Sequence, residues 1–456
     1  MSAHHHAARR LLAVALLSVA APAGGVAQSA AAAPRIELLP AGDALVGTPL
    51  TVRVSGLPNN TQVVLFSQLV DRYGRLWTGE STWASDAAGT VDPSRVAPLA
   101  AAWDGTDPAG PLWSVDRKTV TGAHPRPAGG DAERVAITAI VAGRPVATAA
   151  TRRWFRTAAV EELPVDHDTL VGRLFAPRDG SPRAAILVVP GSGGGIPSAT
   201  AGLLASHGYV ALALAYFGEP GLPPELELVP LELIDTALDW LKRHPRVAPD
   251  RLGIYGGSKG GELALLMASR RPDLRAAVAA VPSSVVFQSI ADDWPRTSSW
   301  SLNGEGLPFV PYSASARFRT SGRLSDLYED SLEDREAAAR ARIAVERAAG
   351  AILLISGRDD RTWPATAMCE EIVAQLERAD FPHRVEHLAY DDVGHEVFAP
   401  GYRPASWSPA VGGTRQGQAA AQADVWPRAI AFLADALGAP PRAPPAADRA
   451  AERRER

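Results

Sequence analysis

The chain has 456 residues, of which 46% are hydrophobic and 21% are charged, and its formal net charge is -4. This length favours two folded domains, and the composition is that of a globular protein. No basic stripe accompanies the near-neutral charge, so nucleic acid is not an expected partner. Cys369 is the only cysteine, which excludes an intramolecular disulfide and a cysteine-type zinc cluster. Its helical surroundings predict a buried, inert thiol, and we expect neither a metal nor a cofactor.

The first 33 residues have the features of an export signal. Arg9 and Arg10 supply positive charge, residues 11–23 form an apolar run, and small residues follow as far as Ala33. We expect cleavage between about Ala23 and Ala33, which would make the mature protein periplasmic or secreted. A disordered alanine-rich leader is the alternative, and the protein would then be cytoplasmic. The apolar run is too short to span a bilayer comfortably, so we expect no stable membrane anchor after cleavage.

Residues 34–158 are typical of an all-β domain. Short strands of alternating or β-branched residues are separated by turn sequences, and no helix of useful length is indicated. The economical arrangement is an immunoglobulin-like β-sandwich. Its tryptophans would fill the core or the contact with a second domain, and lining a ligand site is the alternative. The predicted strands include 51–54, 62–66 and 135–141, and the tryptophans are Trp77, Trp83, Trp103 and Trp113.

From residue 159 to residue 437, strands alternate with helices. Continuous apolar runs are typical of central parallel strands, so the pattern predicts a doubly wound, mostly parallel α/β sheet. Residues 288–340 interrupt this pattern and are predicted to form a lid, while 438–456 are predicted to be a disordered tail. The predicted strands are 184–189, 210–215, 276–281, 351–356 and 384–390, and the predicted helices include 231–243 and 424–437.

The sequence Gly256-Gly257-Ser258-Lys259-Gly260 fits the pattern G-x-S-x-G. It follows a short apolar strand at 251–255 and precedes a helical pattern at 261–268, which is the setting of the nucleophile elbow in an α/β-hydrolase. Glycines are needed because the turn is strained and its flanking backbones pack closely. A coincidental turn is the alternative, but it does not explain both neighbours. Ser258 is therefore predicted to be a nucleophile at the start of a helix.

A serine nucleophile needs a base, and the base needs an orienting acid. Among the histidines after the elbow, His383 lies in a turn and His387 lies within a strand pattern, whereas His395 lies in a loop after the last strand. We therefore predict His395 as the base. The acid should follow the strand at 351–356, and both Asp359 and Asp360 fit. We choose Asp360 and keep Asp359 open.

The oxyanion formed by attack on a carbonyl needs hydrogen-bond donors. The N–H of Lys259 follows the nucleophile, and a second donor should come from the glycine-rich loop 190–195, where we choose the N–H of Ser192. Such a loop could instead cradle a phosphate. Its spacing is not G-x-G-x-x-G opening a helix, and no P-loop lysine follows, so the oxyanion role is preferred.

With these motifs in place, the chain resembles the family of acyl-CoA thioesterases and bile acid-CoA:amino acid N-acyltransferases over nearly all of residues 35–435. The resemblance rests on residues 54–58, 86–92, 103–114, 257–265 and 357–364, together with Tyr390 and Gly394-His395. It implies cleavage of an acyl thioester through an acyl-enzyme, with the second aspartate of the pair, Asp360, as the acid. The acyltransferase branch has cysteine at the elbow, so Ser258 points to water as the acceptor.

Three functions compete at this point. The first is a serine hydrolase of acyl thioesters such as acyl-CoA, with a small-molecule substrate. The second is an exported carboxylic-ester hydrolase on the same scaffold, because the well-known members of the resembling family act inside cells, where acyl-CoA is available. The third is a non-catalytic binding protein, which the intact set Ser258, Asp360 and His395 argues against.

Overall fold

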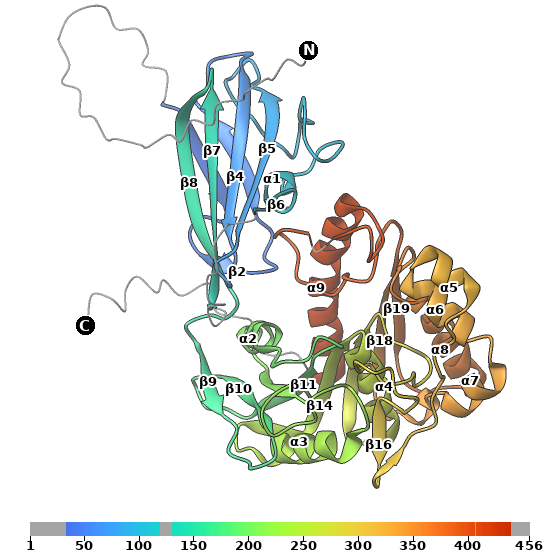
Figure 1. Cartoon of the computed structure of the whole chain (residues 1–456). Helices are drawn as coiled ribbons and strands as arrows, with labels where there is room; N and C mark the ends of the chain where they lie inside the picture. The colour runs from blue at the N-terminus through green and yellow to red at the C-terminus, as the bar shows by residue number, and fades with distance from the viewer. Residues whose placement is uncertain (1–32, 119–129, 406, 439–456) are drawn as a thin grey trace, which may run out of the picture. The chain divides into compact units, whose positions relative to one another are not determined.

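The computed structural model describes residues 33–118, 130–405 and 407–438 (Figure 1). The predicted signal peptide (1–33) and the predicted tail (438–456) lie outside these ranges except for one residue each, so both stay predictions. Within the described ranges, no helix combines the length and apolar character that crossing a membrane requires.

The N-terminal part is a domain rich in β-sheet. A six-stranded sheet has the order β2-β8-β7-β4-β5-β6, and β1 and β3 pair as a separate antiparallel sheet. Along β4, Val63, Leu65 and Leu69 are buried and alternate with more exposed residues, as in a strand with one face on a core. They share a core with buried residues of β3, so the two sheets form a sandwich. The strands are β1 (Arg35–Leu39), β2 (Ala44–Leu45), β3 (Thr51–Ser55), β4 (Gln62–Val70), β5 (Leu76–Ala84), β6 (Asp116–Arg117), β7 (Ala132–Val141) and β8 (Arg144–Trp154).

Tryptophans fill much of this core, as the sequence predicted. Trp83, Trp103 and Trp113 are buried, and Trp77 packs partly buried against the same cluster. The ring centroid of Trp103 lies 6.1 Å from that of Trp83 and 5.6 Å from that of Trp113, in tilted arrangements. Trp113 ends a four-residue helix, α1 (Gly110–Trp113), that the all-β prediction missed because one turn leaves no helical period in the sequence.

The second part contains an eight-stranded sheet in the order β19-β18-β15-β14-β11-β12-β10-β9. Strands β19 to β12 in this order are parallel, and β10 pairs antiparallel with both β12 and β9, so the predicted mostly parallel sheet is confirmed. The strands are β9 (Val160–Pro164), β10 (Val171–Pro177), β11 (Arg183–Val189), β12 (Val210–Ala215), β14 (Val247–Gly257), β15 (Leu274–Ala280), β18 (Ala351–Gly357) and β19 (Val385–Tyr390).

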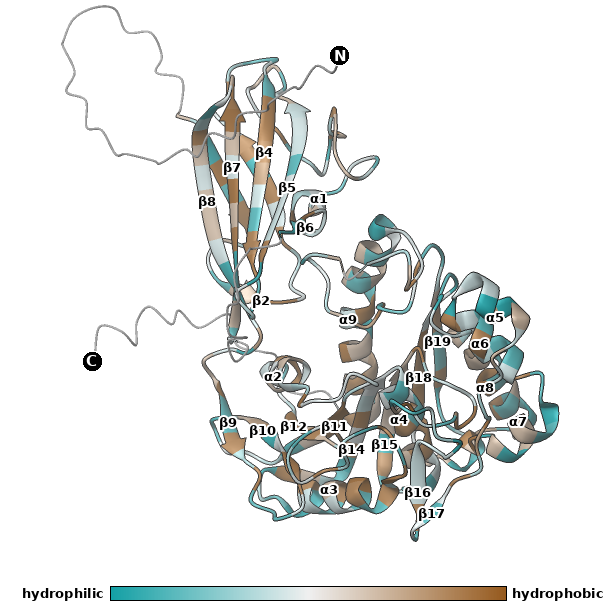
Figure 2. Cartoon of the chain, viewed as in Figure 1, coloured by the Kyte–Doolittle hydropathy of each residue, from teal (hydrophilic) through white to brown (hydrophobic). Residues whose placement is uncertain are grey.

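Both faces of this sheet are covered by helices, which is why its central strands are apolar along their whole length (Figure 2). In β11, Leu187 packs in one core cluster, and its neighbours Ile186 and Val188 pack in the other. The first cluster includes residues of α3 (Leu231–Arg243), α4 (Lys259–Arg270) and α8 (Ala365–Arg378). The second includes residues of α2 (Ser198–Ser206) and α9 (Arg415–Leu437). The fold is therefore doubly wound.

The last helix is longer than the sequence predicted. The expected helix was 424–437, but α9 begins at Arg415, where the side chain of Thr414 accepts a hydrogen bond from the N–H of Gly417. Its first turns are rich in glutamine and alanine and carry no apolar stripe, so periodicity gave no signal there. The helix predicted over 231–243 is confirmed as α3.

Residues between β15 and β18 form an insertion with structure of its own (Figure 1). Its strand β16 pairs with β17 and with β13 in a small three-stranded sheet, and three helices follow. The elements of the insertion are β16 (Trp300–Leu302), β17 (Glu305–Gly306), α5 (Ala316–Ser321), α6 (Leu324–Ser331), α7 (Arg335–Ala341) and the 3-10 helix η1 (Val345–Arg347). Strand β13 (Val229–Pro230) lies outside the insertion, directly before α3.

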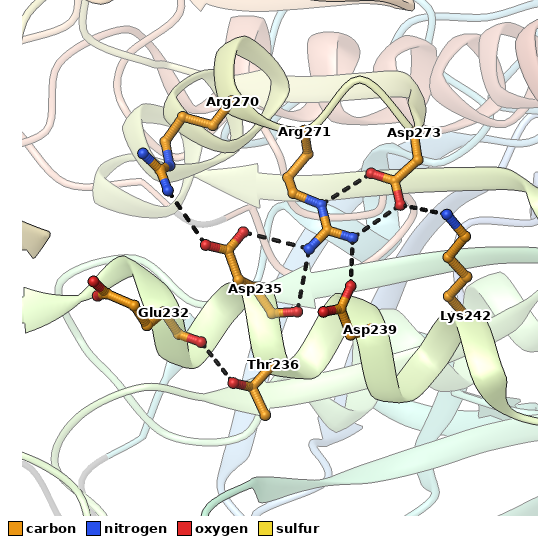
Figure 3. A network of polar contacts seen from close by, with 8 residues as sticks. All are labelled: Glu232, Asp235, Thr236, Asp239, Lys242, Arg270, Arg271 and Asp273. Atoms are coloured by element: carbon orange, nitrogen blue, oxygen red, sulfur yellow. Dashed lines mark hydrogen bonds and ion pairs between the residues drawn. The ribbon is translucent and has the colours of Figure 1, made fainter. Parts of the chain in front are cut away.

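A network of charged side chains fixes the end of α4 against α3 (Figure 3). Arg271, which follows α4, donates from Nε and Nη2 to the two carboxylate oxygens of Asp273 at 2.9 and 2.8 Å. Its Nη2 also donates to Asp239 of α3 at 2.7 Å, and Lys242 of α3 donates to Asp273 at 3.0 Å. The hydrogen bonds from Arg271 hold the pKa of Asp273 well below its usual value.

This network predicts unequal costs for two neighbouring arginines. Arg271→Ala should lower the free energy of unfolding by about 2 kcal/mol, because several charge-assisted bonds are lost from a side chain that is 14% exposed. Arg270→Ala is the matched control, since the side chain of Arg270 makes one ion pair within the described ranges, with Asp235 at 3.3 Å, and its loss should cost less than about 1 kcal/mol. Urea unfolding measures both. Equal losses would contradict this account of the network.

The same comparison has a predicted pH dependence. The pKa of Asp273 is depressed in the folded protein, so its stabilising effect is present above the unfolded pKa and is lost as the pH falls. The difference between wild type and Arg271→Ala should therefore shrink below about pH 4.

Candidate active site

The turn between β14 and α4 holds Ser258 in a strained backbone conformation. Its φ is 57° and its ψ is -125°, a region that residues with a side chain rarely adopt. Gly256 and Gly260 make the turn possible: a Cβ on Gly256 would lie 2.1 Å from the carbonyl oxygen of Gly260, and one on Gly260 would lie 2.4 Å from that of Pro190. Strand, strained serine and helix follow one another as the G-x-S-x-G motif requires.

Ser258, His395 and Asp360 form a continuous chain of hydrogen bonds. The Nε2 atom of His395 lies 2.9 Å from Oγ of Ser258, and its Nδ1 atom lies 2.8 Å from Oδ2 of Asp360. Three separate loops bring them together, after β14, β18 and β19. The side chains of His395 and Asp360 are only 7% and 2% exposed, so solvent barely competes for their contact.

The two candidate aspartates have different partners. The other oxygen of Asp360, Oδ1, accepts hydrogen bonds from the backbone N–H groups of Thr362 and Trp363 at 2.8 and 3.3 Å, which fixes the carboxylate toward His395. The carboxylate of Asp359 instead accepts from Nε and Nη2 of Arg361 at 3.1 and 3.0 Å. It also accepts from the N–H of Gly413 at 2.8 Å. Of the two carboxylates, that of Asp360 contacts the imidazole.

Both predicted oxyanion donors border the same cavity as Ser258. Lys259 is the first residue of α4, and Ser192 belongs to the glycine-rich loop after β11. Among the described residues, neither backbone N–H has a backbone acceptor. The loop is anchored just before Ser192, because the hydroxyl of Tyr216 donates to the carbonyl oxygen of Pro190 at 2.8 Å. Backbone N–H groups without a backbone acceptor, on residues that line the same cavity as Ser258, suit a developing negative charge.

A buried ion pair behind the elbow was not predicted from the sequence. The side chain of Lys259 is 1% exposed and donates from Nζ to Oε1 of Glu262 at 2.7 Å. The same oxygen accepts from Nε1 of Trp300, in the insertion, at 2.6 Å. Burial raises the pKa of Glu262 and lowers that of Lys259. Spacing of three residues on a helix hinted at the Lys259–Glu262 contact, but nothing in the sequence indicated Trp300.

A cavity of about 210 Å³ begins at Ser258 and extends under the insertion. Of the thirteen described residues that line it, eight come from the segment 289–328. Trp363, which belongs to the loop after β18, also lines it, and its ring centroid lies 5.8 Å from that of His395. The residues contributed by the insertion are Ser289, Ile290, Ala291, Trp294, Tyr312, Leu324, Leu327 and Tyr328.

The remaining candidates from the sequence lie outside this constellation. His387 of β19 contacts the hydroxyl of Ser356 through Nε2 at 2.8 Å, and burial lowers its pKa. His383 packs its ring on Phe381, 5.2 Å between centroids. Cys369 of α8 is buried in the core, as predicted, and burial raises the pKa of its thiol. Within the described ranges, no three histidine, cysteine or acidic side chains are grouped so that they could hold a metal ion.

The mostly parallel sheet, the helices on its two faces and the serine elbow define an α/β-hydrolase with an N-terminal β-sandwich. The family described as "BAAT / Acyl-CoA thioester hydrolase C terminal" matches residues 229–439, and "Acyl-CoA thioester hydrolase/BAAT N-terminal region" matches residues 47–167. The chain belongs to this acyl-CoA thioester hydrolase and BAAT family, as the resemblance predicted, and it is an enzyme of the thioester hydrolase class.

Curated relatives align with most of the chain. Acyl-coenzyme A thioesterase 1 of Rattus norvegicus is 28% identical over 429 residues, which cover 88% of this chain and 97% of the rat protein. Acyl-coenzyme A thioesterase 1 of Homo sapiens is 29% identical over 433 residues, with 88% and 96% coverage. The peroxisomal succinyl-coenzyme A thioesterase of Mus musculus is 28% identical over 419 residues, again with 88% and 96% coverage.

A solved structure also aligns with the chain. A puromycin-hydrolysing peptidase of Mycobacterium tuberculosis is 16% identical and covers 80% of this chain and 52% of its own length, with a TM-score of 0.42. The α/β-hydrolase fold follows from the order of strands in the sheet and from the matching family.

The different partners of the two aspartates give a direct test of their roles. Asp360→Asn should lower kcat by about 10³ to 10⁴, because an amide would stabilise the wrong tautomer of His395. Asp359→Asn is the matched control and should change kcat by less than about tenfold, since Asp359 contacts Arg361 and Gly413 instead. Steady-state kinetics on a thioester measures both. The reverse ranking would assign the acid to Asp359.

The buried pair behind the elbow gives a prediction about stability. Lys259→Met should lower the free energy of unfolding by about 3–5 kcal/mol, because Glu262 is left buried without its cation. The double variant Lys259→Met/Glu262→Gln should recover much of this loss. Lys242→Met is the control, since Lys242 is 40% exposed and should cost less than about 1 kcal/mol.

The loss in Lys259→Met should also depend on pH. An unpaired buried Glu262 must take up a proton, so its folded pKa lies above its unfolded value and protonation stabilises the fold at low pH. The variant should therefore be closer to wild type at pH 5 than at pH 8 in thermal unfolding. A pH-independent difference would show that Glu262 carries no charge that needs Lys259.

Proposed function

We propose that the protein hydrolyses acyl thioesters through an acyl-enzyme on Ser258, with His395 as general base and acid and Asp360 as its orienting carboxylate. The observation that carries this proposal is the unbroken hydrogen-bond chain from Oγ of Ser258 through His395 to Asp360 at one end of a cavity. A histidine that is only part of the core could be satisfied by one hydrogen bond to its ring, whereas both ring nitrogens of His395 have partners. Here the imidazole joins a strained serine to a fixed carboxylate, which is the arrangement that activates a hydroxyl.

In the first half-reaction, Oγ of Ser258 attacks the thioester carbonyl carbon while Nε2 of His395 takes its proton. The negative charge that develops on the carbonyl oxygen is stabilised by the N–H groups of Lys259 and Ser192. Collapse of this tetrahedral species breaks the carbon–sulfur bond. The thiol leaves with the proton from His395, and the acyl group stays on Ser258 as an ester. Asp360 stabilises the imidazolium that forms between the two transfers.

In the second half-reaction, water takes the place of the thiol. Nε2 of His395 removes a proton from the water, whose oxygen attacks the ester carbonyl on Ser258. Collapse of the second tetrahedral species returns the proton to Oγ and releases a carboxylic acid. Water, rather than an amino acid, is the proposed acceptor because the elbow residue is serine where the resembling acyltransferases have cysteine.

Coenzyme A thioesters are the substrates that the comparisons support. The aligned rat and human relatives are named acyl-coenzyme A thioesterases and align over 88% of this chain. The second candidate is an exported carboxylic-ester hydrolase, which the signal-like residues 1–33 favour on sequence alone. The two share every residue of the proposed mechanism and differ only in the leaving group.

The nucleophile is tested by covalent labelling together with turnover. A fluorophosphonate probe should label the wild-type protein and leave Ser258→Ala unlabelled, and Ser258→Ala should lose about 10³ or more in kcat on acyl-CoA. Ser269→Ala is the control from the same helix, because its hydroxyl donates only to a carbonyl of α4. Labelling and turnover that persist in Ser258→Ala would sink the assignment. Turnover of p-nitrophenyl esters without turnover of acyl-CoA would favour the second candidate.

A further inference from the structure

The cavity beside Ser258 is walled by aromatic rings that pack on one another. The centroid of Tyr328 lies 5.4 Å from that of Tyr312 and 5.4 Å from that of Trp363, with both pairs edge to face. Trp294 packs edge to face on Tyr312 at 5.5 Å. Each ring is therefore held by a neighbour, and the wall has a defined shape before any ligand enters.

The hydroxyl groups that the insertion contributes to this wall already have partners. The hydroxyl of Tyr312 donates to the carbonyl oxygen of Gln288 at 3.0 Å and lies 3.3 Å from that of Tyr328. The hydroxyl of Ser289 donates to the carbonyl oxygen of Pro295 at 3.1 Å. The described part of the insertion therefore leaves few polar atoms for a group that carries amides, such as the arm of coenzyme A. The cavity therefore suits a hydrocarbon chain better than the leaving group.

The wall offers no free charge for an anionic substituent. Lys259 is the cationic residue among the described lining residues, and its Nζ is buried and paired with Glu262 at 2.7 Å. A carboxylate at the far end of an acyl chain would lose its hydration there and gain no partner.

The size of the cavity limits the length of the chain. An apolar cavity of about 150 Å³ in another protein holds one benzene molecule, which has six carbons. On that scale, a cavity of about 210 Å³ holds an acyl group of about eight carbons. Leu327, in α6, is buried in its wall, and Leu324, at the start of the same helix, is 45% exposed.

We propose that this cavity is the acyl site and that it selects uncharged acyl groups of up to about eight carbons. Thioesters of longer chains and thioesters with a terminal carboxylate should be poor substrates. This inference rests on the proposed function for its reaction, but it concerns the acyl group and not the leaving group.

Two matched substrate series test the proposal. With acyl-CoA thioesters of two to sixteen carbons, kcat/KM should rise by about two- to fourfold per methylene and peak at about eight carbons. It should then fall at least about tenfold by sixteen carbons, where the chain no longer fits. Glutaryl-CoA should be at least about tenfold poorer than pentanoyl-CoA, which has the same number of carbons. A maximum at fourteen or sixteen carbons, or equal rates for the five-carbon pair, would overturn the proposal.

The same series on p-nitrophenyl esters separates this proposal from the proposed function. The same chain-length limit on esters, with no turnover of any thioester, would uphold the acyl site and refute thioester hydrolysis. Turnover of both series without a length limit would refute the acyl site alone. No turnover of either series would refute both.

Variants in the wall provide a second readout. Leu327→Trp should shift the preferred chain to shorter lengths. Leu332→Trp, at a partly buried position just after α6 and outside the cavity lining, should leave it unchanged. Leu324→Arg should raise kcat/KM for glutaryl-CoA relative to pentanoyl-CoA, because it adds a cation beside the cavity. The ratio cancels any effect on coenzyme A itself. Unchanged profiles in both Leu327→Trp and Leu324→Arg would place the acyl group elsewhere.

Discussion

The strained backbone at Ser258 is the constraint on which the proposed chemistry depends. With φ at 57°, the residue leaves the end of β14 and opens α4 in a single step, so its hydroxyl stands beside His395. The same turn makes Lys259 the first residue of a helix, where a backbone N–H has no intrahelical partner. The position of the proposed nucleophile and one proposed oxyanion donor are thus two consequences of one conformation. Packing around Gly256 and Gly260 holds it in place.

The insertion contacts the helix that begins at this turn through a buried hydrogen bond. Glu262 of α4 accepts hydrogen bonds from Lys259 and from Trp300, which belongs to β16 of the insertion. The ring of Trp300 lies 5.5 Å from that of Tyr216, whose hydroxyl anchors the loop that carries Ser192. A change in how the insertion packs would therefore reach both proposed oxyanion donors, Lys259 and Ser192. The aromatic wall of the cavity and the proposed catalytic residues share one buried framework, which would link the proposed substrate preference to the proposed chemistry.

The parts of this site that follow from local sequence could be predicted, and the parts that follow from tertiary packing could not. The elbow has a short motif between a strand and a helix, so Ser258 and Lys259 were accessible from sequence. His395 and Asp360 could be predicted because each follows a predicted strand in the chain order of this fold. The partner of Glu262 in the insertion, Trp300, lies 38 residues away, and no local pattern records such a contact.

The fold shows the same division. The central strands of the sheet could be predicted from their continuous apolar runs, which occur because both faces of the sheet are covered. The first turns of α9 could not be predicted, because their glutamines and alanines carry no helical period and their helical structure depends on the surrounding packing. The aromatic wall also had no signal in the sequence. Tyr312 and Tyr328 of the insertion come together with Trp363, from the loop after β18, only in the folded protein.

The acyl-enzyme is the central claim, and a partition measurement tests it most directly. Hexanoyl-CoA and p-nitrophenyl hexanoate would be turned over by the wild-type enzyme in the presence of methanol, and the ratio of methyl hexanoate to hexanoic acid would be measured for each. If both substrates pass through one hexanoyl ester on Ser258, water and methanol compete for the same species and the two ratios are equal. Ratios that depend on the leaving group would contradict a shared acyl-enzyme.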